Sequence, residues 1–193
     1  QFAVGSKQEA DGSKILLIDG REVKFFSEKE PANLPWKELD IDVIVESTGL
    51  FTDYERASAH ITAGAKRVVI TAPAKGAGGE TVLMGVNEDK LATCQISSNA
   101  SCTTNAASPV IAILDEAIGI EKAVLSTTHG YTASQSIVDG PSRKDMREGR
   151  AAAMNIVPTS TGAATAVAQA YEPLAGKFDG ISLRVPVSAG SIA

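Results

Sequence analysis

The sequence predicts an α/β protein built around a parallel sheet, and three observations support this prediction. Aromatic residues are scarce at 5%, while small and branched apolar residues are common, as close packing of helices against strands requires. Strand-like runs alternate with a helical segment in the first half of the chain, which indicates parallel strands joined by right-handed crossovers. The pattern changes near residues 97–101, so we expect two domains, at 1–100 and 101–193.

The first domain is expected to open with a hairpin. Asp19-Gly20, a strong signal for a tight hairpin turn, separates apolar runs at 14–19 and 22–26. Further strands are expected at 41–46, 67–71, 81–86 and 95–98, together with a helix at 55–65 that ends near Gly64.

The second domain is expected to begin with a long helix. Apolar residues at helical spacing predict it over 103–118, where Pro109 produces either a kink or an irregular first turn. A strand at 122–128, a helix at 161–171 and an alternating strand at 181–187 are also predicted. The intervening segment 130–158 is long and polar, and a loop of that length in a compact domain is usually functional.

Composition excludes several classes of protein. The net charge of the 193 residues is -5, and in the absence of a Lys/Arg-rich run we expect no nucleic-acid partner. No apolar run reaches the length of a membrane span and no signal peptide is evident, so we expect no membrane partner. Two cysteines do not make a disulfide framework, which indicates a reducing, cytoplasmic compartment. Because Gln1 begins in mid-pattern, we expect the chain to be a segment of a longer protein.

The strongest chemical signal is N-A-S-C-T-T-N, residues 99–105, which places Cys102 at the start of the long helix. A free thiol is mostly protonated at neutral pH, and the partial positive charge of a helix N-terminus favours the reactive thiolate. The hydroxyls of Ser101 and Thr103 beside it suit an anion or a developing oxyanion. The alternative is an inert cysteine at a helix start.

His129 strengthens the interpretation of Cys102 as a nucleophile. It lies at the end of a predicted strand, where its side chain could meet a helix end across a cleft, and a Cys–His pair distant in sequence is the general form of an activated thiol. A histidine satisfied within a polar turn is the alternative. His60 is interpreted as a surface residue of its helix, and the spacing of Cys94 and Cys102 predicts no metal site.

Three further places in the sequence suit an anion. Thr132 follows His129 by three residues, and Thr161-Gly162 precedes a helix whose N–H groups could hold a phosphate. Arg184 is a charge on an otherwise apolar strand and therefore needs a partner. A turn threonine, a helix cap and a structural ion pair are the respective alternatives.

Taken together, these motifs resemble the phosphorylating glyceraldehyde-3-phosphate dehydrogenase family over nearly the whole chain. The matching motifs of the second half are S-N-A-S-C-T-T-N (98–105), H-G-Y-T (129–132), N-I-V-P-T-S-T-G-A-A (155–164) and L-R-V-P (183–186). Those of the first half are E-P-A-N-L (30–34), E-S-T-G-L-F-T (46–52) and I-T-A-P-A-K (70–75). All of them occur in the order that the family shows.

The resemblance implies a fold and an activity. The first half would be the later part of a Rossmann-like NAD-binding domain whose glycine-rich start is not in the chain, and the second half the first part of an α+β catalytic domain with a mixed or antiparallel sheet. The family oxidises D-glyceraldehyde 3-phosphate with NAD in glycolysis, and inorganic phosphate cleaves a cysteine thioester to give 1,3-bisphosphoglycerate. The segment 130–158 resembles a loop near the cofactor at a subunit interface, which implies a homotetramer, and 139–142 resembles the NAD-using branch.

Individual roles are implied only for positions that match. Cys102 would attack the aldehyde, while His129 would activate the thiol and act as acid and base. Thr132 and Arg184 would hold the phosphate of the substrate. Residues that match the attacking-phosphate site are Ser101, Thr103, Thr161 and Gly162. Residues that match the cofactor site are Lys29, Thr48, Gly49, Phe51, Thr71 and Asn99. Glu148 stands where some relatives place an arginine at the phosphate site.

Two alternatives stay open. Erythrose-4-phosphate dehydrogenase uses the same thiol chemistry, although residues 129–132 resemble the glyceraldehyde form more closely. The chain could also be a catalytically incompetent fragment that acts only as a binding or assembly segment. An aspartate-semialdehyde dehydrogenase is disfavoured, because its substrate has no phosphate for Thr132 and Arg184 to hold.

Overall fold

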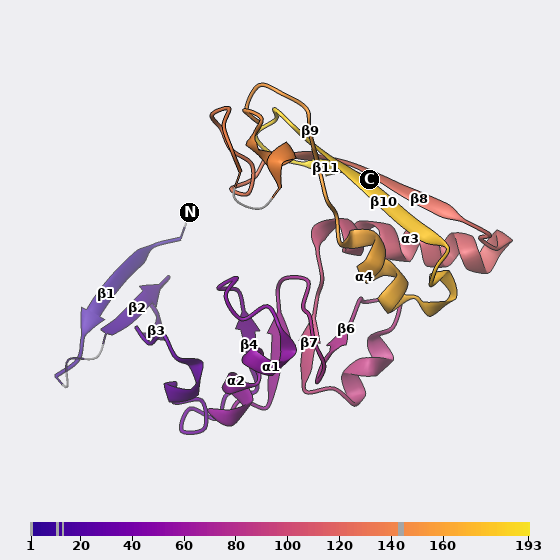
Figure 1. The fold of residues 1–193 in the computed structure, drawn as a ribbon. Helices are drawn as coiled ribbons and strands as arrows, with labels where there is room; N and C mark the ends of the chain where they lie inside the picture. Colours follow the sequence, from indigo (N-terminus) through magenta and orange to yellow (C-terminus); the bar gives the residue numbers. More distant parts are fainter. Residues whose placement is uncertain (1, 11, 13, 143–144) are drawn as a thin grey trace.

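The computed structural model describes residues 2–10, 12, 14–142 and 145–193, which form three sheets and several helices (Figure 1). The first sheet is antiparallel, in the order β1-β2-β3. Its strands are β1 (Val4–Gln8), β2 (Lys14–Ile18) and β3 (Arg21–Phe25). Asp19 and Gly20 between β2 and β3 have φ values of 48° and 77°, as a tight hairpin turn requires. The predicted hairpin is confirmed, and β1 is an additional strand that the sequence did not indicate.

The second sheet is parallel throughout, in the order β4-β5-β7-β6. Its strands are β4 (Val43–Glu46), β5 (Arg67–Ile70), β6 (Glu80–Thr81) and β7 (Ile96–Ser98). The core on one face of this sheet is a cluster of buried side chains from Tyr54, Ala57, Val68, Ile70 and Ile96. The predicted parallel sheet is therefore confirmed, and the carboxyl ends of β4, β5 and β7 lie along one edge of it.

The strand predicted at 81–86 is wrong beyond Thr81. The side chain of Asn87 accepts a hydrogen bond from the Leu83 amide at 2.8 Å and donates to the Thr81 carbonyl at 2.9 Å. These bonds take up backbone groups that a longer strand would have offered to its neighbour, so the chain turns away from the sheet. A 3-10 helix, η2 (Glu88–Ala92), follows.

The helix predicted at 55–65 is two short helices, α1 (Tyr54–Ala57) and α2 (Ala59–Thr62). The hydroxyl of Ser58 at their junction donates to the Glu55 carbonyl at 2.6 Å, a local bond that competes with continuous helix. Gly64 ends the second helix with a φ of 104°, and a Cβ added there would collide with Lys37. Glycine is therefore required where the chain passes the turn that follows η1 (Pro31–Asn33).

The third sheet is mixed, in the order β11-β8-β10-β9. Its strands are β8 (Ala123–Gly130), β9 (Val157–Thr159), β10 (Phe178–Val185) and β11 (Ser191–Ile192). β8 and β10 are parallel, while β9 and β11 join them antiparallel. The predicted combination of a parallel sheet and a following mixed sheet is confirmed.

Two helices pack against the long strands of the mixed sheet (Figure 1). They are α3 (Cys102–Ile118) and α4 (Ala163–Ala170). Their shared core contains Ala107, Ile111, Leu125, Val167 and Leu174. Two short 3-10 helices, η3 (Met146–Gly149) and η4 (Glu172–Leu174), precede and follow α4 in the sequence. The first turn of α3 is regular, so an irregular first turn before Pro109 is excluded. Within the described residues, no helix combines the length and apolar character needed to span a membrane.

Candidate active site

Cys102 lies immediately after a turn that leads from β7 into α3. Ala100 in this turn has a φ of 53° and is buried, a left-handed conformation that costs an alanine about 1 kcal/mol. Side chains on both sides hold it there. Ser98 Oγ accepts from the Ala100 amide at 3.0 Å, and Asn105 Nδ2 donates to the Asn99 and Ser101 carbonyls at 2.7 and 2.9 Å. The position of Cys102 is thus fixed by its neighbours.

The start of α3 presents the thiol of Cys102 to solvent. Ser101 is the helix cap, and its Oγ accepts from the Thr104 amide at 3.1 Å. Cys102 is the first residue of the helix and is exposed. The unpaired N–H groups of this first turn carry the positive end of the helix dipole, which stabilises negative charge beside them.

His129 lies close to this thiol, on the mixed sheet. Its Nε2 is 3.7 Å from Cys102 Sγ, within hydrogen-bond reach for sulfur. The parallel register of β8 and β10 places Arg184 directly opposite His129. Arg184 Nη1 is 2.6 Å from His129 Nδ1 and donates to the Gly130 carbonyl at 3.1 Å. Three of the predicted residues, 27 and 55 positions apart, therefore meet at one point.

The two contacts of His129 Nδ1 correspond to different tautomers. A guanidinium only donates, so the contact with Arg184 requires a lone pair on Nδ1 and puts the proton on Nε2, facing Cys102. Nδ1 also lies 2.7 Å from the Gly130 carbonyl, a contact that requires a proton on Nδ1 and leaves Nε2 free to accept one. Arg184 thus favours the His129 tautomer with its proton on Nε2, whereas the Gly130 carbonyl favours the tautomer with its proton on Nδ1.

Arg184 is a half-buried cation, and its partners in the described part of the chain are His129 and the Gly130 carbonyl. Within the described residues no carboxylate forms an ion pair with it, and its buried Nε has no hydrogen-bond partner. The predicted alternative of a structural ion pair therefore has no support from these residues. A cation in this setting is suited to an anionic ligand.

The other predicted anion-binding residues lie on three elements. Thr132 is exposed after β8, and its Oγ1 donates to Gln135 Oε1 at 3.1 Å. Thr161 Oγ1 accepts from the Ala163 amide at 3.1 Å at the start of α4, beside the exposed Gly162. Thr103 is buried, with Oγ1 4.0 Å from Cys102 Sγ. Of these hydroxyls, that of Thr103 lies beside the thiol, while Thr161 and Gly162 lie at the start of α4.

Four of the predicted cofactor residues lie at the carboxyl ends of the parallel strands. Thr48 and Gly49 follow β4, Thr71 follows β5, and Asn99 follows β7. All four are exposed, and Gly49 has a φ of 74° with open space around its Cα. This edge is where nucleotides bind in open α/β sheets.

The two remaining cofactor residues have different surroundings. Phe51 is half-buried, and the guanidinium of Arg56 lies 5.1 Å from the centre of its ring. Lys29 is exposed in the segment that follows β3.

The interpretation of His60 as a surface residue is wrong. His60 is 5% exposed and bonds to Glu46, the last residue of β4. The sequence signal that could have revealed this pair is a carboxylate at the end of an apolar strand, which needs a partner when buried.

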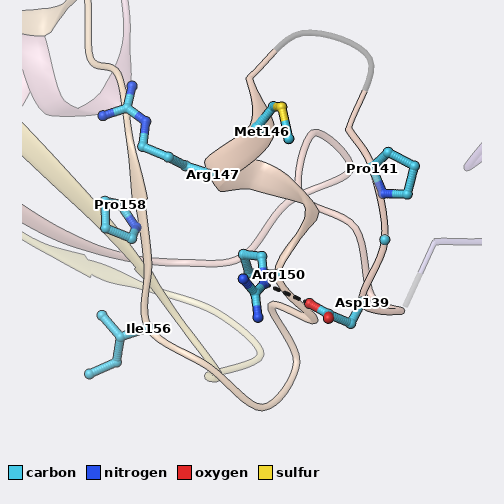
Figure 2. Close-up of a pocket in the computed structure, with 8 residues that line it drawn as sticks. Asp139, Pro141, Met146, Arg147, Arg150, Ile156 and Pro158 are labelled. Atoms are coloured by element: carbon cyan, nitrogen blue, oxygen red, sulfur yellow. Dashed lines mark hydrogen bonds and ion pairs between the residues drawn. The ribbon is translucent and has the colours of Figure 1, made fainter.

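The long segment 130–158 surrounds a pocket of about 660 Å³ (Figure 2). Arg150 Nε donates to Asp139 Oδ1 at 2.8 Å across it, and Arg147 pairs with Asp145 nearby. Glu148 is buried and accepts from Thr159 Oγ1 at 2.5 Å, so its side chain ties η3 to β9. Residues 143 and 144 of this segment lie outside the described residues.

Comparison with known proteins gives a consistent result. Residues 101–193 match the model of the glyceraldehyde 3-phosphate dehydrogenase C-terminal domain, and residues 3–54 match that of the glyceraldehyde 3-phosphate dehydrogenase NAD binding domain. The chain is 52% identical over 178 residues to glyceraldehyde-3-phosphate dehydrogenase 1 of Trichoderma koningii, covering 92% of this chain and 52% of the relative. It is 51% identical over 178 residues to glyceraldehyde-3-phosphate dehydrogenase of Streptomyces coelicolor, covering 91% and 52%.

The chain spans about half the length of the curated relatives it matches. The match to the NAD binding domain ends at residue 54, and the match to the C-terminal domain begins at residue 101, just before Cys102. The two domains therefore occur along the chain in the same order as the motifs of the two halves. The chain belongs to the glyceraldehyde-3-phosphate dehydrogenase family.

Proposed function

We propose that the protein carrying this chain oxidises D-glyceraldehyde 3-phosphate to 1,3-bisphosphoglycerate with NAD and inorganic phosphate, through a thioester on Cys102. The observation that carries the proposal is the 3.7 Å approach of Cys102 Sγ and His129 Nε2 at the N-terminus of α3. In this proposal residues 1–100 belong to the cofactor domain and residues 101–193 to the catalytic domain.

The first step is attack by the thiol. With the His129 proton on Nδ1 and directed at the Gly130 carbonyl, Nε2 takes the proton of Cys102, and Sγ forms a bond to the aldehyde carbon. The carbonyl oxygen receives the displaced electron pair and is protonated by Nε2, which gives a hemithioacetal. The positive end of the α3 dipole stabilises the developing oxyanion.

The second step is oxidation of the hemithioacetal. NAD, when bound, supplies the two-electron acceptor. His129 Nε2 takes the hydroxyl proton back as the C–H bond breaks, and the carbon remains on Sγ as a thioester. An oxygen of inorganic phosphate then attacks that carbon, the C–S bond breaks, and Cys102 leaves as the thiolate.

The two phosphates are assigned to separate groups of residues. Arg184 and Thr132 hold the substrate phosphate, which is supported by the finding that no carboxylate among the described residues pairs with Arg184. The attacking phosphate is held at the start of α3 and α4, by Ser101, Thr103, Thr161 and Gly162. Thr103 would contribute its backbone N–H, because its side chain is buried.

The parallel sheet has surroundings that suit a dinucleotide. Thr48, Gly49, Thr71 and Asn99 offer exposed polar groups and an open glycine along one sheet edge, beside the turn that carries Cys102. Phe51 and Lys29 complete the proposed cofactor set.

We assign the partner surface to the segment 130–158. Ile137, Val138, Met154 and Ile156 are exposed there, by 65%, 78%, 83% and 64% of their surface. Apolar side chains gathered on one loop are suited to cover by another subunit, which supports a homotetramer. The proposed location is the cytoplasm, where this glycolytic step takes place.

The test is NADH formation by the full protein that carries this chain, with aldehyde, NAD and phosphate. Cys102→Ser should abolish turnover, and omission of phosphate should limit the reaction to a single burst. Comparison with erythrose 4-phosphate distinguishes the two substrates. Turnover that survives Cys102→Ser would overturn the mechanism, and an inactive but NAD-binding wild type would favour an assembly role.

A further inference from the structure

A line of hydrogen bonds runs behind the loop 47–49. Trp36 Nε1 donates to His60 Nδ1 at 3.1 Å, and His60 Nε2 lies 2.9 Å from Glu46 Oε2. The indole and imidazole rings are stacked at 28°. Glu46 and His60 are 4% and 5% exposed, so none of these bonds is easily replaced by water.

The donors and acceptors along this line have one consistent arrangement. An indole N–H only donates, so His60 Nδ1 holds a lone pair and its proton is on Nε2, which donates to Glu46. The other carboxylate oxygen, Oε1, accepts from the Thr48 amide at 2.7 Å and from the Thr48 hydroxyl. Thr48 Oγ1 in turn accepts from the Leu50 amide at 3.1 Å. Glu46 is therefore an acceptor on both oxygens.

The ionisation of Glu46 agrees with this role. Burial is the largest single influence and opposes ionisation. The hydrogen bonds from Thr48 and His60 nevertheless outweigh it and hold the pKa of the carboxyl below its ordinary value of 4.5. The side chain is thus a buried carboxylate whose charge is met by three donors.

Glu46 also holds the neighbouring strand end. Its backbone carbonyl accepts from the Thr71 amide at 3.0 Å and from Thr71 Oγ1 at 3.1 Å. Thr48 and Thr71, two residues of the proposed cofactor set, are therefore both anchored to one residue that itself lies beneath the surface.

We propose that Trp36, His60 and Glu46 are positioning residues, a directional relay that holds Thr48 and the loop 47–49 in the conformation that receives the dinucleotide. The inference rests on the proposed function only in taking this loop to contact NAD. The hydrogen bonds of this relay need a particular order of donors and acceptors as well as a particular packing of side chains. This need for a donor–acceptor order distinguishes the relay from packing alone.

Glu46→Gln tests the order of donors and acceptors, because glutamine keeps the shape of the side chain but replaces one acceptor oxygen by an NH₂ donor. A glutamine that still accepts from Thr48 must turn its NH₂ toward His60, which then needs its proton on Nδ1, facing the indole N–H of Trp36. One donor is left facing another. Trp36→Phe removes that donor, so the double variant E46Q/W36F should be less impaired than E46Q alone. A structural role for Trp36 alone predicts that the two losses add.

The measurements are made on the full protein that carries this chain. Hydrogen exchange of the segment 47–50, measured without cofactor, reports how firmly the loop is held. Calorimetric titration with NAD, without aldehyde, reports the affinity for NAD. E46Q should speed exchange and raise the Kd for NAD by about tenfold, the loss of one charge-assisted bond. The matched control is Tyr54→Phe, which removes a buried side-chain hydroxyl bonded to Thr81 on β6, at the opposite edge of the same sheet.

The outcomes separate the relay from the proposed function. Exchange in E46Q no faster than in Tyr54→Phe, or a double variant at least as impaired as E46Q, would overturn the relay. Faster exchange with rescue in the double variant, but an unchanged Kd in both E46Q and Thr48→Val, would support the relay and overturn the cofactor role of Thr48.

Discussion

Replacing Arg184 separates recognition of the substrate phosphate from chemistry at the thiol. Arg184→Met keeps the length of the side chain and removes its charge. Among the described residues the half-buried guanidinium contacts His129 and the Gly130 carbonyl but no carboxylate, so its remaining N–H groups are available to a phosphate. A hydrogen bond between charged groups contributes about 1.5–3 kcal/mol, so kcat/KM for glyceraldehyde 3-phosphate should fall about 10- to 150-fold.

The control is the same enzyme with glyceraldehyde, which has no phosphate. For that substrate kcat/KM of Arg184→Met should change by less than about threefold, because Cys102 and His129 remain in place and His129 Nδ1 can still donate to the Gly130 carbonyl, as the attack on the aldehyde requires. Arg184→Lys should recover part of the loss, since it restores the charge without the planar fork. Equal losses for both aldehydes would refute the assignment and would mean that Arg184 acts chiefly through the imidazole of His129.

Three further predictions concern the site and its support. Asn105→Ala frees the left-handed turn before Cys102 and should lower the rate at which iodoacetamide alkylates this thiol, as followed by mass spectrometry; an unchanged rate would contradict the role of the turn. Val167→Ala, at a fully buried position, should lower the free energy of unfolding by about 2 kcal/mol in urea, and a loss below about 0.5 kcal/mol would contradict this packing. Because the pKa of Glu46 is lowered on folding, its stabilisation is present above about pH 4.5 and lost as the pH falls through the folded value, so acid unfolding should be less steep in E46Q.

Local chemistry was sufficient where a few adjacent residues set the conformation. Asp19-Gly20 determines a turn through backbone angles that few other residues adopt. Ser101 and the apolar spacing behind Cys102 likewise determine the start of α3. The parallel sheet followed from the alternation of strand and helix.

The errors arose where a side chain finds a partner that periodicity does not reveal. Asn87 ends β6 by binding backbone groups of residues 81 and 83, and Ser58 divides the predicted helix. The prediction for His60 rested on the expectation that its helix lies at the surface, yet His60 is hydrogen-bonded to both Glu46 and Trp36. Propensity is weak information beside such contacts.

The sequence by itself determined the chemical inventory of this protein: a thiol at a helix start, one histidine at a strand end, and one arginine on an apolar strand. Tertiary structure alone decided that these groups meet. The parallel register of β8 and β10 brings Arg184 opposite His129 across 55 positions of sequence, and the packing of α3 against the mixed sheet brings Cys102 to the same histidine. The physical reason is that register and packing depend on contacts between distant segments, which spacing along the chain does not encode.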